Sequence, residues 1–172
     1  MAESTESRVT IAPGAVVCRD AVIRGTVTIG TGTVVHPKAQ ILAESGPIVI
    51  GENNLIEELA VVANRSSKSP LHIGNYNVFE ISSLCEARHV GNSNVVEIKG
   101  KVGRLVELGN GCVVGADCQL LTPGRQPDHS VVQGAAHRRR LAKDPPKLQA
   151  SQLDYLKKAL PNFHHLANKK TG

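Results

Sequence analysis

Aromatic residues are almost absent from this 172-residue chain. It has no tryptophan, and its only aromatic residues are Phe79, Phe163, Tyr76 and Tyr155. A core built around large rings is therefore excluded, and so is an aromatic platform for stacking nucleic-acid bases. Because 41% of the residues are apolar, the chain can still fill a core, which must consist of aliphatic side chains in narrow, regular layers.

Paired cysteine motifs, a secretion signal and a long apolar run are missing as well. The four cysteines show no C-x-x-C spacing, and the start MAESTESR lacks the apolar stretch that a secretion signal needs. No run of about 18 apolar residues occurs, so we expect no membrane span. These absences predict a reduced, intracellular and soluble protein.

What the chain does have is a period of six. A residue that we call the guide residue, nearly always aliphatic, returns at every sixth position with three breaks. A period of six fits neither a helix nor an isolated strand, but it fits a short strand followed by a tight turn, three of which close a triangular coil. The guide residues are Ile11, Val17, Ile23, Ile29, Val35, Ile41, Ile50, Ile56, Val62, Ile73, Phe79, Cys85, Val90, Val96, Val102, Leu108, Val114 and Leu120.

Taking the hexads in threes gives the coils. All three breaks in the period follow a third hexad, so we expect the inserted residues at one corner of the prism. A partial seventh coil is predicted at SVVQGA, with Val131 in the guide position. Asn54, Asn77 and Asn94 occupy equivalent places and are predicted to hydrogen-bond in a column. The fold class is therefore an all-β solenoid, a parallel β-helix of about seven triangular coils with a C-terminal α-helix.

The chain divides into four predicted parts. Residues 1–8 are expected to be a flexible N-terminus, 9–134 the hexapeptide-repeat β-helix, 135–147 a basic connector, and 148–172 the C-terminal helix and tail. Residues 135–172 hold nine Lys and Arg against two Asp, a net charge of +7, whereas the rest of the chain has eleven basic and thirteen acidic residues. The absence of a nucleic-acid-binding motif disfavours nucleic acid as the partner of this basic tail.

The tail carries an apolar stripe at helical spacing. Leu153, Leu156, Leu160 and Phe163 follow one another at steps of three, four and three, and Pro161 is expected to end or kink the helix after Leu160. We expect the stripe to pack lengthwise on one wall of the prism, with docking to a partner as the alternative. The stripe and the neighbouring Tyr155 are candidate partner-binding residues.

The residues that could carry catalysis do not converge in the repeat. His36, His72 and His89 are assigned to different places on their coils, so we expect no histidine metal site, and no cofactor-binding module is evident. A histidine acting alone as the base of an acyltransferase is the catalytic alternative. Cys85, Cys112 and Cys118 fall at inward positions and are expected to be structural, while Cys18 is expected at the surface. We therefore predict no catalytic, cofactor-binding or metal-binding residues.

An acidic column is the other candidate surface. Glu57, Glu80 and Glu97 each follow the second guide residue of their coil, so they project outward on consecutive coils about 5 Å apart, with His36 one coil below. Like charges at this spacing repel unless they are solvated or paired. A solvated face is one interpretation, and a docking site for a basic partner surface is the other.

Five phrases carry a resemblance to a known family. They are IAPGAVV from Ile11, VTIGTGTVVHPKAQI from Val27, GPIVIGENNLIEE from Gly46, IGNYNVFE from Ile73 and QLDYLKKALPNFHHL from Gln152. Together they are similar to the dynactin subunit 6 family, over nearly the whole chain. The hexads alone are common to many unrelated enzymes, whereas the tail phrase is specific. The hexapeptide repeat itself resembles the left-handed parallel β-helix family, which implies a left-handed coil against the general preference for right-handed crossovers.

The resemblance implies a non-catalytic subunit of the dynactin pointed-end complex. Its expected partners are the fifth subunit of dynactin, itself a similar β-helix, together with the fourth subunit and the pointed-end actin-related protein. The expected location is cytoplasmic and cytoskeletal, including kinetochores, in support of dynein-driven transport along microtubules. No nucleic acid, membrane span, cofactor or small-molecule substrate is implied. A β-helical enzyme of the hexapeptide class, an acyltransferase or a γ-carbonic-anhydrase-like protein, is the rival prediction.

Overall fold

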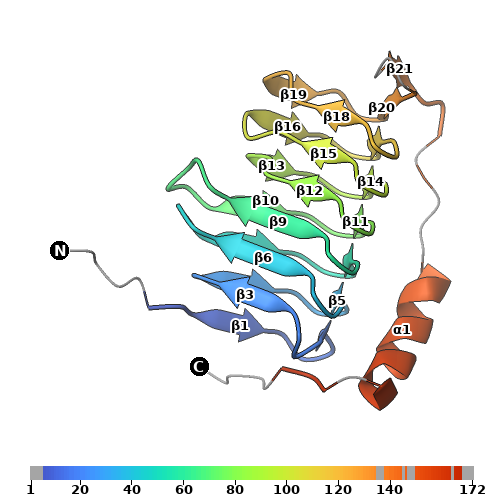
Figure 1. Cartoon of the computed structure of the whole chain (residues 1–172). Coiled ribbons are helices and arrows are strands. Elements are labelled where there is room, and N and C mark those ends of the chain that lie inside the picture. Colours follow the sequence, from blue (N-terminus) through green and yellow to red (C-terminus); the bar gives the residue numbers. More distant parts are fainter. Residues whose placement is uncertain (1–5, 135–137, 145, 147–149, 164, 168–172) are drawn as a thin grey trace.

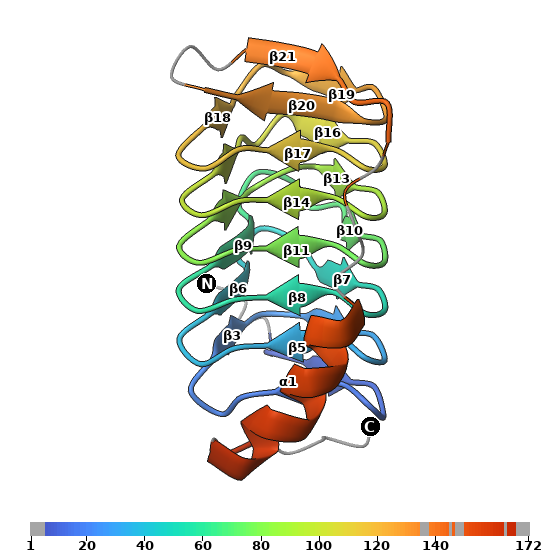
Figure 2. The same ribbon diagram turned by 90° about the vertical axis from the view of Figure 1, so that its right-hand side faces the viewer.

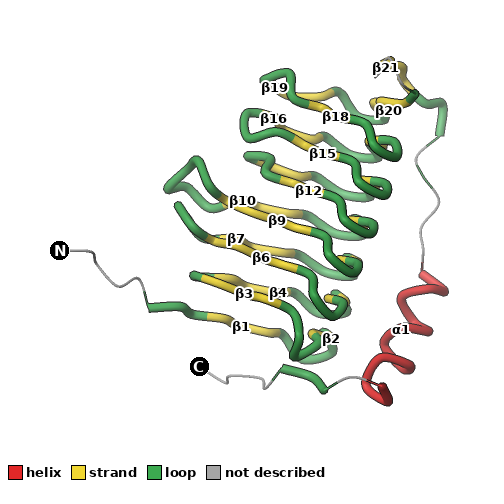
Figure 3. The backbone as a smooth tube through the Cα atoms, viewed as in Figure 1, coloured by secondary structure: helices red, strands yellow, loops and turns green. Residues whose placement is uncertain are grey.

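Three sheets form the walls of a triangular prism in the computed structural model, which describes residues 6–134, 138–144, 146, 150–163 and 165–167 (Figure 1). Each turn of the chain adds one short strand to each wall, and loops make the corners (Figure 3). The predicted fold class, a left-handed parallel β-helix of about seven coils with a C-terminal helix, is confirmed.

The first two walls, sheets A and B, run the full height of the prism. Sheet A consists of β1 (Val9–Ile11), β4 (Val27–Ile29), β7 (Ile48–Ile50), β10 (Leu71–Ile73), β13 (His89–Val90), β16 (Val106–Leu108) and β19 (Gly124–Gln126). Sheet B consists of β2 (Val16–Val17), β5 (Val34–Val35), β8 (Leu55–Ile56), β11 (Val78–Phe79), β14 (Val95–Val96), β17 (Val113–Val114), β20 (Ser130–Gln133) and β21 (Arg138–Leu141).

The third wall, sheet C, has six strands. They are β3 (Val22–Arg24), β6 (Gln40–Ala43), β9 (Val61–Asn64), β12 (Leu84–Cys85), β15 (Lys101–Val102) and β18 (Gln119–Leu120). All neighbouring strands pair in parallel except β20 and β21, which pair antiparallel. Strand β21 lies within the segment predicted to be the connector, and it covers the edge of the last coil.

The guide residues form the core. Those of neighbouring coils lie opposite one another, as Ile56 does with Phe79. All are buried except Ile23, which is half-buried in the first coil. The seventh coil is shifted by one residue from the prediction, because Val132, not Val131, pairs with Val114, and the buried Gln126 pairs with Leu108. The period of six therefore continues without a break, but the polar Gln126 hides it in the sequence.

The inserted residues lie at the corner between sheets C and A, as predicted. The loop between β9 and β10 is the longest of them and projects from the prism (Figure 1). Arg65 in this loop bonds Glu44 of the coil below and Glu86 of the coil above, each at 2.9 Å. The loop is thus tied to both neighbouring coils.

Glycine follows the guide residue at the corner between sheets A and B because the coils approach closely there. A Cβ atom on Gly74 would lie 2.6 Å from the carbonyl oxygen of Gly91 and 2.2 Å from the side-chain oxygen of Asn92, both in the next coil. Contacts this short do not occur between real atoms, so a side chain would push the coils apart. Gly74 does not have a positive φ, so the close approach of the coils, and not freedom to turn, is what requires glycine there.

The same corner contains the predicted asparagine column. Asn54, Asn77 and Asn94 are at most 1% exposed. The side-chain oxygen of Asn77 accepts hydrogen bonds from the backbone N–H and the side-chain amide of Asn94, at 2.9 and 3.0 Å. The side-chain amide of Asn77 donates to Asn54 and to the carbonyl of Gly91, at 3.0 and 2.9 Å. These buried polar groups are therefore satisfied by their neighbours above and below.

The helix α1 (Ala150–Phe163) lies lengthwise against the lower part of sheet B, over β2 and β5 (Figure 2). Pro161 does not end it, because the helix continues to Phe163. A proline so close to the C-terminus removes only one backbone N–H from the last turn, which limits its cost. This helix of 14 residues, the one helix in the part of the chain that the structure describes, is not long and apolar enough to cross a membrane.

Candidate interaction surface

The acidic column lies at the corner between sheets B and C, which we call the B–C corner. Glu57, Glu80 and Glu97 are half-buried there on three consecutive coils. The Glu80 carboxylate accepts a hydrogen bond from the backbone N–H of Ile98 at 3.0 Å, and Glu97 accepts one from Ala116 at 2.8 Å. Each of these carboxylates thus fastens the corner turn of the next coil, a role that the sequence did not indicate. One face of the column still reaches solvent.

Burial changes the protonation of two members of the column. It raises the pKa of Glu57 above the usual value of 4.5, and the charge of Glu80 adds to this shift. Burial likewise raises the pKa of Glu80, with a further contribution from Glu97, against the opposing hydrogen bond from Ile98. The folded chain therefore holds these protons to a higher pH than the unfolded chain does.

We predict a specific pH dependence from this shift. The stability that the two protonated groups contribute is present below pH 4.5, their usual pKa, and is lost as the pH rises through the folded pKa values. In the double variant Glu57→Gln, Glu80→Gln this loss of stability should disappear. At pH 7 the free energy of unfolding of the variant should be the same as that of wild type or higher by up to about 0.5 kcal/mol. Urea unfolding between pH 4 and 7 measures it, with exposed Glu52→Gln as the control. A variant less stable at pH 7 by more than about 1 kcal/mol would show that the carboxylate bonds matter more than the charge.

The helix buries part of its predicted stripe against its own prism. Leu153 and Leu160 are 5% and 8% exposed, and Leu156 is half-buried. They pack on the outward side chains of sheet B, Val16, Val34, Leu55 and Val78. Tyr155 is 68% exposed, on the side of the helix away from the wall. The backbone of Phe163 ends the helix, but its side chain lies outside the described residues.

Polar contacts tie the helix to two corners. The Gln152 side-chain amide donates to Glu57 at 3.4 Å, at the lower end of the acidic column. The Lys157 ammonium group donates to the Asn53 side chain, also at 3.4 Å, at the opposite corner. After the helix, Ala167 donates to the carbonyl of Val17 and the carbonyl of His165 accepts from Arg19, at 2.9 and 2.6 Å. The segment 165–167 is thereby fastened to the first coil.

Deleting residues 148–172 tests this docking. The change should expose Val34 and Leu55, which are now fully buried, and lower solubility, while the β-sheet circular dichroism signal remains. We expect the Tm to fall by roughly 5 °C, or about 2 kcal/mol in a chain of this size. In the intact protein, limited proteolysis should remove the helix slowly. If the helix is cleaved as fast as an unstructured tail, it is not packed in the free chain and is ordered only by a partner.

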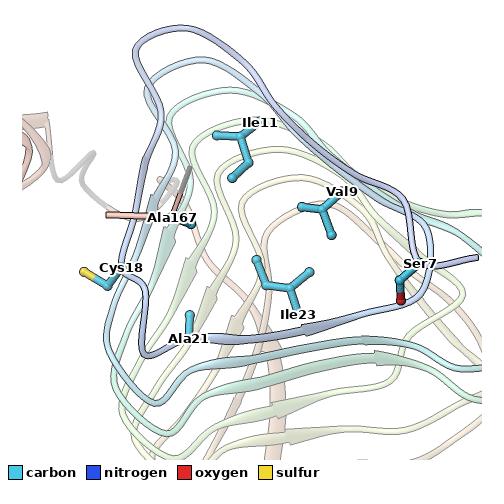
Figure 4. Close-up of a pocket in the computed structure, with 7 residues that line it drawn as sticks. All are labelled: Ser7, Val9, Ile11, Cys18, Ala21, Ile23 and Ala167. Atoms are coloured by element: carbon cyan, nitrogen blue, oxygen red, sulfur yellow. The ribbon is translucent and has the colours of Figure 1, made fainter. Parts of the chain in front are cut away.

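An apolar mouth opens at the first-coil end of the prism (Figure 4). Its volume is about 310 Å³, and its wall includes Val9, Ile11, Ala21 and Ile23. Ala167 lies at one side of the mouth, near Cys18, and the remaining lining residue is Ser7. This wall lacks histidine and carboxylate side chains, and the sulfur of Cys18 points away from the hollow (Figure 4). In the part of the chain that the structure describes, the hollow is the open end of the core.

The histidines are arranged differently from the sequence assignment. His72 and His89 lie directly opposite one another on neighbouring strands of sheet A, followed by Glu107 on the next strand. The prediction that no two histidines are equivalent is therefore wrong. The five-residue step from Cys85 to Val90 made two assignments of His89 possible, and the structure selects the outward one. Even so, the described residues contain no group of three or more His, Cys, Asp or Glu side chains placed to hold a metal ion.

The cysteines are buried thiols. Burial raises the pKa of Cys85 to about 12 and, together with Asp20 and Glu58, that of Cys18 to about 11. The expectation that Cys18 is at the surface is wrong, because the residue pairs with Leu166 in a β-bridge and is 1% exposed. Thiols with raised pKa values are poor nucleophiles at neutral pH.

A surface that the sequence analysis missed runs beside the acidic column. Leu59, Ile81 and Ile98 occupy the tips of the B–C corner on the third, fourth and fifth coils, and they are 50%, 43% and 45% exposed. We call these three residues the corner ridge. Their signal in the sequence was an apolar residue two or three positions after the second guide residue, where polar turn residues are expected.

Curated relatives resemble the chain along nearly its whole length. Dynactin subunit 6 of Nematostella vectensis is 45% identical over 175 residues, which cover 96% of this chain and 95% of that protein. The Danio rerio protein of the same name is 48% identical and covers 98% and 91%, and the Xenopus tropicalis protein is 49% identical and covers 95% and 85%. No protein-family model matches the chain.

Solved structures share the fold at low sequence identity. A hexapeptide transferase family protein from Anaplasma phagocytophilum superposes with a TM-score of 0.69 at 18% identity, covering 91% of this chain and 89% of that one. A putative acetyltransferase from Bacillus cereus gives 0.52 at 14% identity, covering 88% and 87%. At such identities the likeness concerns the solenoid alone and carries no inference about catalysis.

Proposed function

Because the chain belongs to the dynactin subunit 6 family, we propose that it is a non-catalytic structural subunit of the dynactin pointed-end complex and pairs there with the fifth subunit. The fourth subunit and the pointed-end actin-related protein are the further partners. In this proposal the chain works in the cytoplasm, on the cytoskeleton and at kinetochores, in support of dynein-driven transport along microtubules. It has no small-molecule substrate and no cofactor.

The observation that carries the proposal is the extent of the identity. The chain is 45% to 49% identical to three proteins called dynactin subunit 6, and the matched regions cover at least 95% of it. The match therefore includes the C-terminal segment as well as the hexads. Since hexads recur in unrelated enzymes, the tail gives the proposal its specificity.

The prism suits a role in assembly. Its walls are built of strands that are hydrogen-bonded coil to coil, so it offers a rigid surface that loses little entropy on binding. The acidic column and the helix surface, with Leu153, Tyr155, Leu156, Leu160 and Phe163, are the proposed partner-binding elements. Leu153 and Leu160 are packed against sheet B of the same chain, whereas Tyr155 is exposed and accessible to a partner.

The rival function is a hexapeptide-class enzyme. It would require a metal or a histidine base in a cleft, and His72 and His89 lie instead on the outer face of a wall. Metal analysis of the purified chain, with esterase and carbon dioxide hydration assays, separates the two. One equivalent of tightly held zinc that is lost in His72→Ala or His89→Ala would favour the enzyme.

Co-expression with the other pointed-end subunits tests the pairing. Wild type should co-elute with the fifth subunit at one to one, and the triple variant Glu57→Gln, Glu80→Gln, Glu97→Gln should fold but pair more weakly. The matched control is the double variant Glu52→Gln, Glu107→Gln. Glu107 lies on sheet A and Glu52 at the corner between sheets A and B, both away from the acidic column. Unchanged pairing of the triple variant would show that the acidic column is not part of the interface. Absence of pairing in wild type would refute the proposal.

A further inference from the structure

The corner ridge is an apolar edge of limited length. Ile81 and Ile98 stand in the same place on successive coils, each directly after a glutamate of the acidic column. Leu59 precedes them one coil below. The equivalent turns on the adjacent coils contain Lys38 on one side and Ala116 and Asp117 on the other. The edge therefore spans three coils and ends at charged residues.

The ridge is rigid. Backbone hydrogen bonds join the corner turns from coil to coil: Ser82 donates to the carbonyl of Glu58, Lys99 to Ile81, and Asp117 to Ile98, at 3.1, 3.1 and 2.9 Å. The carboxylates of Glu80 and Glu97 add further bonds to the same turns. The apolar side chains are thus presented on a frame that does not have to be ordered when a partner binds.

Leu59 occupies an unfavourable backbone position. Its φ is 60°, in the left-handed region that asparagine or glycine adopts at lower cost. The equivalent left-handed residues on the other coils are polar: Lys38, Ser82, Lys99 and Asp117. An exposed leucine at this position neither fills the core nor eases the turn. It does not stabilise the folded chain, which points to contact with another molecule as its role.

Charge differs across the ridge. On the sheet B side lie the carboxylates of the acidic column. On the sheet C side the half-buried Val61 and Leu84 widen the apolar surface, and Lys99 and Lys101 lie at its upper end. A partner that covers the ridge must therefore present apolar side chains in the middle of its surface and positive charge along one edge.

We propose that the corner ridge binds a pointed-end partner through an apolar strip bordered on one edge by lysine or arginine, the basic edge facing Glu80 and Glu97. This inference rests on the proposed function and deepens it. The site lies beyond the end of α1, at the corner on the left of Figure 2, where the wall of the prism is not covered by the helix. Glu57 already accepts a bond from Gln152 of the helix, so the part of the acidic column that the helix does not contact is the part beside Ile81 and Ile98.

The test is binding of three variants to the co-expressed fifth subunit, with the fourth subunit and the actin-related protein as further probes. Ile81→Ser with Ile98→Ser should weaken binding at least tenfold, and Leu59→Asn should weaken it several-fold with a Tm no lower than wild type. Leu105→Ser, an equally exposed apolar residue at another corner, is the control and should bind like wild type. Raising the salt concentration should weaken wild-type binding, and less so the triple glutamine variant.

The outcomes separate this inference from the proposed function. The ridge variants must first show the circular dichroism spectrum of the wild type. If wild type binds and these variants bind with an affinity within twofold of it, the ridge is not the interface, and the family role stands. If Leu105→Ser weakens binding as much as the ridge variants do, the effect is not specific to the ridge and the inference fails. If wild type binds none of the three probes, both proposals fail.

Discussion

Replacing Asn77 with alanine should cost about 4 kcal/mol of unfolding free energy, a large fraction of the roughly 5–15 kcal/mol by which a typical domain is stable. The side chain is fully buried, and its oxygen accepts two hydrogen bonds from Asn94 while its amide donates to Asn54 and to the carbonyl of Gly91. Alanine would leave the two donors of Asn94 without this acceptor and would open a cavity in the wall of the core. Each unpaired buried group costs about 1–3 kcal/mol.

Asn75 provides the matched control for this experiment. It lies two residues away in the same turn, and its side-chain oxygen accepts a bond from the backbone N–H of Glu52 at 2.7 Å, near the surface. Water can replace that bond, so Asn75→Ala should cost below about 1 kcal/mol. Chemical denaturation of both variants measures the difference. Equal losses would mean that burial of the Asn77 column is not what makes it important.

Truncating Ile56 to alanine should cost roughly 2–5 kcal/mol. Ile56 is fully buried at mid-height and lies opposite Val35 below and Phe79 above. Its neighbours are held by strand pairing on both sides, so the wall cannot collapse into the cavity that the change creates. Ile98→Ala, at an exposed corner, is the control and should cost no more than about 0.5 kcal/mol. A loss at Ile56 as small as that would place its side chain outside the core.

The period of six predicted most of this fold because one residue in six must fill the core at a fixed place. The corner of the insertions and the asparagine column followed from the same frame. The prediction failed where a local change disguised that frame. Gln126 is polar in a guide position, and the short step before Val90 left two places open for His89. Strand β21 belongs to no hexad, so the repeat could not indicate it.

The candidate surfaces were harder to predict. The outward direction of Glu57, Glu80 and Glu97 followed from the hexads, but their bonds to the next coil depend on how closely two corners approach. That distance is not encoded in the spacing of residues. Ile81 and Ile98 were overlooked, although each stands two residues after the second guide residue, at a turn position. That their side chains are exposed follows only from the structure.

Sedimentation of the tagged chain in native cytosol tests the central claim most directly. If the chain is a structural subunit of dynactin, nearly all of it should sediment with the intact dynactin assembly, far from the position of a free 18.3 kDa protein, and its partners should be recovered in fixed proportion. The triple variant Ile81→Ser, Ile98→Ser, Leu59→Asn should shift part of it to the light fractions. Wild type found wholly in the light fractions, without other dynactin subunits, would contradict the claim.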